Sequence, residues 1–272
     1  MNISYLGPKG TFSELALVTY FNNNSKIIAK SSIEDVFKSI IDLSCKYGIV
    51  PVENSIEGAV NNTLDQLLEN DIYIVGEITI PIKQCLLSKN KTINKLTKIY
   101  SHSQSFAQCR KWISQNIPDA ILSPVLSNSE GAISIKKEDD ACIGPEILAS
   151  YYGLNVLADN IQDFKNNETR FLVICKEMID IKSPSNSKTS IVVTPKSENK
   201  SGSLYHLLKP FSENNINLTR IESRPLKVEN WQYSFFIDFE GYYDNENIQR
   251  TFELIKEDNN DLKLLGSYNS NI

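Results

Sequence analysis

The sequence predicts an α/β protein in two parts, a larger two-lobed part followed by a small βαββαβ unit. Short apolar strands alternate with helical patterns from residue 3 to residue 175, which is typical of α/β architectures. Residues 182–188 then interrupt this pattern with a polar stretch that contains one proline and indicates a linker. We therefore expect one domain at residues 1–180 and a second at residues 188–272.

The strands of the first part end at turns or polar junctions. Residues 3–6 form an apolar strand that ends at Gly7-Pro8, and residues 49–50 form another that Pro51 closes. Residues 72–87 are rich in strand formers, and we expect them to cross between two lobes. The further predicted strands are 98–100, 121–122, 141–144 and 169–175.

The helix starts carry capping boxes, in which a Ser or Thr is followed three residues later by an acid. Thr11 with Glu14 and Ser127 with Glu130 fit this pattern, and residues 31–35 offer two overlapping choices, Ser31 with Glu34 or Ser32 with Asp35. The alternation of strands and helices favours mostly parallel pairing. Helix N-termini present unpaired N–H groups, so a ring of them around a cleft could bind a small polyanion without a basic surface.

The second part has the element order of a ferredoxin-like module. Its predicted elements are a strand, a helix, two strands, a helix and a strand. They fall at residues 189–194, 203–212, 216–223, 231–239, 247–255 and 262–267.

The composition excludes several classes of function. The net charge of -5 argues against a general nucleic-acid binder. No apolar stretch approaches the roughly 20 residues of a membrane helix, and the N-terminus lacks a secretory signal, so we expect a cytoplasmic protein. The five cysteines are scattered and predict free buried thiols. The two histidines lie far apart, so we expect no metal site.

Five segments, taken in order, resemble the prephenate dehydratase family. They are residues 5–13 (YLGPKGTFS), 51–58 (PVENSIEG), 101–104 (SHSQ), 127–130 (SNSE) and 166–171 (NNETRF). Three positions depart from the family pattern, with Ser103 in place of Pro, Ser203 in place of Ala and Asn128 in place of Thr. The resemblance implies a two-lobed catalytic domain like that of periplasmic binding proteins. The first strand begins near residue 2, so we expect no fused mutase domain.

The C-terminal part resembles the amino-acid-binding module known as the ACT domain. The matching segments are residues 202–206 (GSLYH), 222–225 (ESRP) and 265–268 (LGSY). The resemblance implies that phenylalanine binds between two paired modules and inhibits the enzyme, so we expect a homodimer or homotetramer. The residues implied for this regulatory site are Gly202, Ser203, Leu204, Asn217, Leu218, Glu222, Ser223, Arg224 and Pro225.

The implied reaction converts prephenate to phenylpyruvate, carbon dioxide and water, with no cofactor because the ring becomes aromatic. The resemblance makes Thr169 the residue expected to donate a hydrogen bond to the leaving hydroxyl. We expect Arg170 to hold the pyruvyl carboxylate through two parallel hydrogen bonds, with Phe171 beside a less polar corner. Glu53 or His102 could supply the proton, although a structural role for Glu53, as the partner of a basic group in the hinge, is slightly favoured.

Several polar residues near the predicted helix starts are candidate substrate donors. Each of them also has an explanation as a helix cap or turn former, and the two roles can coexist. These candidates are Thr11, Asn54, Ser55, Ser101, Gln104, Ser127 and Asn128.

Other functions remain open at this point. Arogenate dehydratase removes the same groups from an amino version of the substrate, and no residue separates the two activities. A non-catalytic regulator could use the same two-lobed scaffold to bind a small molecule. Prephenate dehydrogenase is disfavoured because the chain contains no Gly-x-Gly-x-x-Gly nucleotide motif.

Overall fold

The first lobe is built around a six-stranded sheet. The computed structural model describes residues 1–21, 25–179, 186–196, 201–226, 232–258 and 260–270. The sheet has the order β2-β1-β3-β11-β5, with the short β4 paired to β3. Its strands are β1 (Asn2–Leu6), β2 (Lys26–Lys30), β3 (Tyr47–Asn54), β4 (Gly58–Ala59), β5 (Tyr73–Pro81) and β11 (Glu168–Cys175).

Three helices cover the two faces of this sheet. Helix α1 (Phe12–Phe21) packs on one face through Ala16 and Leu17, where Phe171 and Val173 of β11 are buried. Helices α2 (Ile33–Ile41) and α3 (Asn61–Glu69) pack on the other face. Ser32 caps α2 by accepting a hydrogen bond from the Asp35 N–H at 3.0 Å, which settles the choice between the two overlapping capping boxes.

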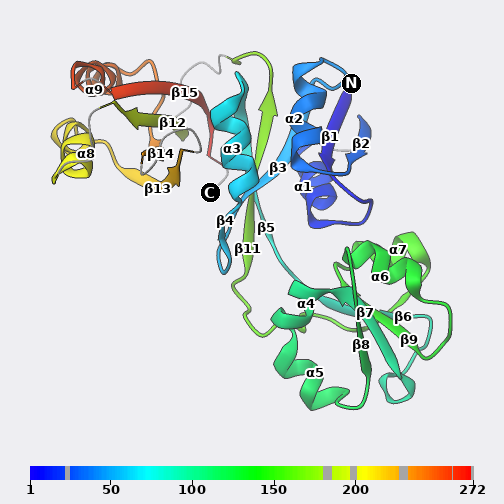
Figure 1. The fold of residues 1–272 in the computed structure, drawn as a ribbon. Coiled ribbons are helices and arrows are strands. Elements are labelled where there is room, and N and C mark those ends of the chain that lie inside the picture. The colour runs from blue at the N-terminus through cyan, green and yellow to red at the C-terminus, as the bar shows by residue number, and fades with distance from the viewer. Residues whose placement is uncertain (22–24, 180–185, 197–200, 227–231, 259, 271–272) are drawn as a thin grey trace.

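The second lobe contains a five-stranded sheet with the order β10-β6-β9-β7-β8. Its strands are β6 (Cys85–Ser88), β7 (Lys98–His102), β8 (Ile121–Val125), β9 (Asp140–Gly144) and β10 (Asn155–Ala158). Its helices are α4 (Ser103–Gln108), α5 (Arg110–Asn116), α6 (Asn128–Ser134) and α7 (Ile147–Tyr152), with a 3-10 turn η1 (Ile93–Lys95). The chain enters this lobe after β5 and leaves it before β11, so two linkers join the lobes (Figure 1).

The expectation of mostly parallel pairing is wrong. β1 pairs in parallel with β2 and β3, and β7 pairs in parallel with β8 and β9. β11 is antiparallel to both β3 and β5, and β6 is antiparallel to both β9 and β10. The physical reason is the double crossing: a chain that leaves a lobe and returns to it adds a strand in the opposite direction.

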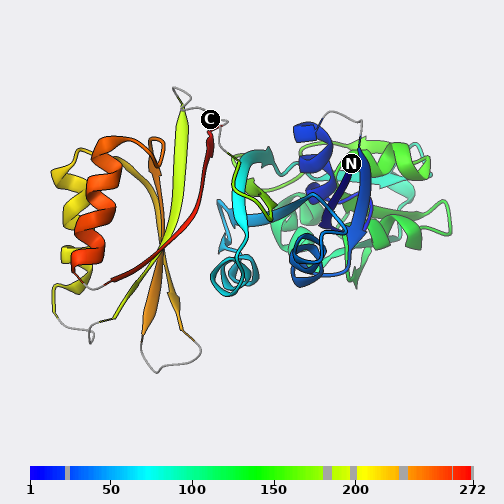
Figure 2. The same ribbon diagram turned by 90° about the horizontal axis from the view of Figure 1, so that it is seen from above.

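The C-terminal sheet has the predicted βαββαβ element order. β12 (Ser187–Pro195), α8 (Ser203–Glu213), β13 (Leu218–Pro225), β14 (Tyr233–Glu240), α9 (Glu246–Glu257) and β15 (Asn260–Asn269) form an antiparallel sheet with the order β13-β14-β12-β15. Both helices cover one face, and the other face turns toward the first lobe (Figure 2). Residues 182–185 of the expected linker and Trp231 lie outside the described residues.

The C-terminal sheet and the first lobe share a buried interface. Val192, Phe236 and Leu265 belong to the same apolar cluster as α2 and α3. Gly266 allows the closest approach, because a Cβ atom there would lie 2.1 Å from the Ile74 carbonyl oxygen of β5. Its φ of +147° also disfavours other residues. The interface is therefore packed at the level of the backbone.

All five cysteines are free and buried, as predicted. None of the helices in the described segments combines the length and the apolar character needed to cross a membrane.

Candidate active site

A polar cavity of about 290 Å³ lies between the two lobes. First-lobe strands and loops, the first linker and the second lobe all contribute to its wall. The lining residues are Leu6, Thr11, Phe12, Asn54, Ile82, Gln84, His102, Gln104, Ser105, Gln108, Leu126, Ser127, Asn128, Pro145 and Thr169. Among these described lining residues there is no lysine or arginine, so a bound anion would be held by uncharged donors and by His102.

Thr169 and Asn54 form the first-lobe wall of the cavity. They are directly opposite each other on the paired strands β11 and β3. Asn54 Nδ2 donates to Thr169 Oγ1 at 2.9 Å, and it also lies 2.8 Å from Asn167 Oδ1 and 3.1 Å from the Glu168 carbonyl oxygen. Because the Thr169 oxygen accepts from Asn54, its own proton is available to a group in the cavity.

Asn128 organises the second-lobe wall. Its Oδ1 lies 3.0 Å from each of three donors, Ser101 Oγ, Ser105 Oγ and the His102 N–H. An amide whose oxygen is fully occupied in this way keeps its NH₂ group for other partners. Asn128 is the first residue of α6, and Ser127 caps that helix by accepting from the Glu130 N–H at 3.0 Å.

Helices α1, α4 and α6 all begin at this cavity. Thr11 precedes α1, His102 caps α4 by accepting from the Gln104 N–H at 3.3 Å, and Ser127 caps α6. Three polar helix starts therefore meet at the cleft. Thr11 Oγ1 lies 3.4 Å from the Glu14 N–H, while the Glu14 carboxylate accepts from the Gly10 N–H, so the acid bonds one residue earlier than a capping box requires.

Two of the predicted donors, Ser101 and Ser55, are not among the lining residues. Ser101 is fully buried and its Oγ lies 2.9 Å from the Ile143 carbonyl oxygen. Ser55 bonds the second linker, accepting from the Glu168 N–H at 3.0 Å and lying 3.2 Å from the Asn166 carbonyl oxygen. Both residues hold cavity walls in place.

The structure does not bring Arg170, Glu53 or Phe171 to this cavity. Side chains alternate along a strand, so Arg170 points to the opposite face from Thr169. Its guanidinium contacts Glu77 and Asp238, each at 2.6 Å, and Glu53 lies 3.1 Å from Arg220. Phe171 is 2% exposed in the core beneath α1. The prediction that Arg170 holds a substrate carboxylate is therefore corrected: in this structure Arg170 binds the C-terminal sheet.

Gln84 and Gln108 line the cavity although no sequence motif indicates them. Gln84 Nε2 lies 3.3 Å from Ser105 Oγ and 3.4 Å from Gln108 Oε1. Gln84 lies in the first linker, and the Ile161 N–H of the second linker donates to its carbonyl oxygen at 3.0 Å. Gln84 belongs to none of the matching sequence segments, so only the folded chain shows that it reaches the cleft.

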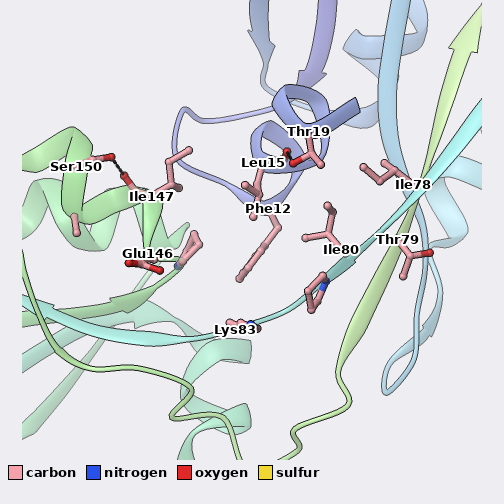
Figure 3. Close-up of a pocket in the computed structure, with 13 residues that line it drawn as sticks. Phe12, Leu15, Thr19, Ile78, Thr79, Ile80, Lys83, Glu146, Ile147 and Ser150 are labelled. Atoms are coloured by element: carbon pink, nitrogen blue, oxygen red, sulfur yellow. Dashed lines mark hydrogen bonds between the residues drawn. The ribbon is translucent and has the colours of Figure 1, made fainter. Parts of the chain in front are cut away.

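A larger cavity of about 710 Å³ lies on the other side of Phe12 and Pro145, which line both cavities. Figure 3 shows Leu15 of α1, Ile78 and Ile80 of β5, and Ile147 of α7 around it. Its wall is mainly apolar, with Lys83 and Glu146 as the only charged lining residues described. The smaller cavity is the better site for a polyanion because its wall presents many polar side chains.

The predicted regulatory residues lie at two ends of the C-terminal module. Gly202 is the left-handed N-cap of α8, with φ +89°, at the end of the sheet where β13 finishes. Asn217 and Leu218 precede or begin β13, so they lie at its opposite end. Arg224 binds Asp65 of α3 through two contacts of 2.6 and 2.9 Å. A single chain therefore does not gather all nine residues around one ligand.

A polar cavity between two linked α/β lobes, joined to a βαββαβ module, defines a two-lobed small-molecule-binding protein with a C-terminal module. The chain matches the family described as Prephenate dehydratase over residues 3–179. It is 43% identical to a bifunctional chorismate mutase/prephenate dehydratase of Aquifex aeolicus over 269 residues, covering 98% of this chain and 73% of that one. It is 40% identical to a prephenate dehydratase of Methanocaldococcus jannaschii, covering 98% and 97% of the two chains.

A solved structure is similar to this chain over nearly its whole length. The prephenate dehydratase of Arthrobacter aurescens in complex with L-Phe superposes with a TM-score of 0.90 at 29% identity, covering 99% of this chain and 90% of that one. The chain belongs to the prephenate dehydratase family. Members of this family are enzymes of phenylalanine biosynthesis.

Proposed function

We propose that the chain converts prephenate to phenylpyruvate in the polar cavity, with Thr169 beside the departing hydroxyl. One observation carries this proposal: the Thr169 hydroxyl accepts from Asn54 and so has its proton free on the cavity side. Removal of a carboxylate as carbon dioxide leaves an electron pair that enters the ring as the hydroxyl departs. Thr169 would donate to the oxygen while negative charge develops on it.

The atom balance requires one proton from the enzyme or solvent. A prephenate dianion and one proton yield the phenylpyruvate anion, carbon dioxide and water. Of the two proton sources considered from the sequence, Glu53 lies beside Arg220 and His102 lines the cavity. His102 Nδ1 accepts from the Gln104 N–H, so a neutral ring would carry its proton on Nε2 and could only donate a hydrogen bond, because loss of that proton would leave an imidazolate anion. The proton itself would therefore come from the imidazolium form of His102 or from solvent.

The uncharged wall suits a reaction in which a carboxylate leaves as neutral carbon dioxide. A cationic clamp on the departing carboxylate would stabilise the bound substrate more than the transition state. Amide and hydroxyl donors from Asn128, Gln104 and Thr11 would instead hold the retained pyruvyl carboxylate near the helix starts. The remaining carboxylate would then lie toward the apolar side chains of Phe12 and Ile82.

For regulation, we propose that residues 1–180 are a catalytic domain and residues 188–272 an ACT domain that binds phenylalanine. Support comes from the βαββαβ order and from the L-Phe complex of the Arthrobacter aurescens relative. Because the predicted regulatory residues lie at two ends of one module, a second copy would complete the site, as in a homodimer or homotetramer. A cytoplasmic location stays a prediction.

Purified protein incubated with prephenate tests the proposal through an absorbance assay for phenylpyruvate. Turnover of prephenate that exceeds turnover of arogenate supports it. Binding of prephenate without product would instead indicate a non-catalytic regulator. Saturating L-phenylalanine should lower the rate, and activity that is indifferent to phenylalanine would remove the regulatory part.

A further inference from the structure

Two adjacent strands carry the candidate catalytic pair on one face and a charged pair on the other. β3 and β11 place Asn54 opposite Thr169 at the cleft, and Glu53 opposite Arg170 one residue away. Because successive side chains point to opposite faces, the second pair turns toward the C-terminal sheet. A contact on that sheet therefore acts on the same backbone that holds Thr169.

Arg170 is bound on three sides within this interface. Its Nε donates to Glu77 at 2.6 Å, its Nη1 to Asp238 at 2.6 Å and its Nη2 to the Tyr268 hydroxyl at 3.0 Å. Glu77 belongs to β5 of the first lobe, whereas Asp238 and Tyr268 belong to β14 and β15. All the donor nitrogens of the guanidinium are thereby fixed, which sets its position along β11.

The partners of Arg170 are themselves held. Asp238 Oδ1 accepts from Ser190 Oγ at 2.6 Å, and Glu77 Oε1 accepts from Lys188 Nζ at 2.6 Å. Burial alone lowers the pKa of Arg170, yet Asp238, Tyr268 and Glu77 outweigh it and raise that pKa above its ordinary value. A buried and fully hydrogen-bonded charge network is rigid, because any displacement exposes unpaired charge.

We propose that Asp238 of the C-terminal sheet is a positioning residue for the reaction, acting through Arg170 on the neighbouring Thr169. This inference rests on the proposed dehydratase activity with Thr169 at the reacting oxygen. Displacement of a reacting group by about 1 Å can reduce a rate on the order of a hundredfold. If the C-terminal sheet shifted, Arg170 would move with it, and Thr169 is the adjacent residue on β11. The shift would therefore affect the cavity directly through the β11 backbone and not through the cores of the lobes.

The test compares kcat and KM for variants of the full-length enzyme. Asp238→Asn keeps the shape of the side chain but removes its charge, and Tyr268→Phe removes only the hydroxyl that binds Arg170. We expect Asp238→Asn to lower kcat on the order of ten- to a hundredfold and to leave KM within about twofold, because orientation matters most in the transition state. Tyr268→Phe should lower kcat less and serves if Asp238→Asn does not fold.

Asp65→Asn is the matched control. Asp65 also binds an arginine of the C-terminal sheet through two contacts, of 2.6 and 2.9 Å to Arg224. It lies on α3, which carries none of the cavity-lining residues described. We expect Asp65→Asn to leave kcat within about twofold. An equal loss in Asp65→Asn and Asp238→Asn would show a general effect of the interface and would overturn the inference.

A double-mutant cycle with Thr169→Ala separates positioning from loss of stability. If Asp238 acts through Thr169, Asp238→Asn should change kcat little once the Thr169 hydroxyl is gone. Losses that multiply fully in the double variant would overturn the inference. If the parent enzyme does not turn over prephenate, both the proposed function and this inference are wrong. If the parent enzyme is active and kcat is unchanged in Asp238→Asn and Tyr268→Phe, only this inference is wrong.

Discussion

Replacing Thr169 with valine removes one hydroxyl and almost nothing else. Valine has nearly the same shape, and Thr169 is only 9% exposed. Asn54 Nδ2 would lose an acceptor at 2.9 Å but keep Asn167 Oδ1 at 2.8 Å and the Glu168 carbonyl at 3.1 Å. Because no donor is left unpaired, we expect the free energy of unfolding to change by no more than about 1 kcal/mol.

The cost to catalysis should be much larger than the cost to stability. Loss of one donor aimed at developing negative charge typically reduces kcat about 10²–10³-fold, or about 3–4 kcal/mol. We expect this loss in Thr169→Val, with KM changed by about threefold or less. Thr169→Ser keeps the hydroxyl and should stay within about tenfold of the parent enzyme.

The assay is phenylpyruvate formation from prephenate, measured beside thermal unfolding of the same preparations. A folded Thr169→Val enzyme with kcat within twofold of the parent would refute the role of the hydroxyl. An equally large loss in Thr169→Ser would show that the site depends on shape at this position and would contradict the hydrogen-bond argument.

Three other outcomes follow from the same geometry. Asn54→Asp should lower kcat/KM at least about tenfold, because the new carboxylate would face Asn167 Oδ1 and a dianionic substrate. Unchanged kinetics would contradict the role of Asn54 as the residue that orients the Thr169 hydroxyl. Gly266→Ala should lower the free energy of unfolding in urea by about 2–4 kcal/mol, because its Cβ would meet the Ile74 carbonyl. Gly153 also has a positive φ but has open space around it, so Gly153→Ala should lower the free energy of unfolding by only about 1–2 kcal/mol. For Asp238, burial alone would raise the pKa, but Arg170 and Arg220 lower it below its ordinary value. The stability that Asp238 contributes is therefore full above about pH 4 and is lost as pH falls through the folded pKa. The difference in unfolding free energy between the parent and Asp238→Asn should accordingly shrink below about pH 4, and a difference that grows in acid would contradict the sign.

Much of the fold was predictable because it depends on local patterns. The capping residues Ser32 and Ser127 mark true helix starts, and the βαββαβ order was visible as alternating apolar segments after residue 188. Strand direction was not predictable in the same way. β11 returns from the second lobe and pairs with both β3 and β5, and nothing in its own residues shows that route.

The candidate site was predictable only in part, and the reason is again geometric. Thr11, Asn54, Gln104, Ser127, Asn128 and Thr169 line one cavity, as the motifs implied. Arg170 belongs to the same motif as Thr169, but the period of a strand sends it to the opposite face. Gln84 shows the reverse case, because a residue outside every motif reaches the cavity through a linker.

A crystal structure of the Thr169→Val variant soaked with prephenate tests the central claim most directly. The account predicts density for prephenate in the smaller polar cavity. The ring hydroxyl should lie within about 4 Å of the Val side chain that replaces Thr169, and a carboxylate should lie within about 3.2 Å of Asn128 or Gln104. Density instead in the apolar cavity beside Ile80, or a ligand whose hydroxyl points away from the substituted position on β11, would contradict it.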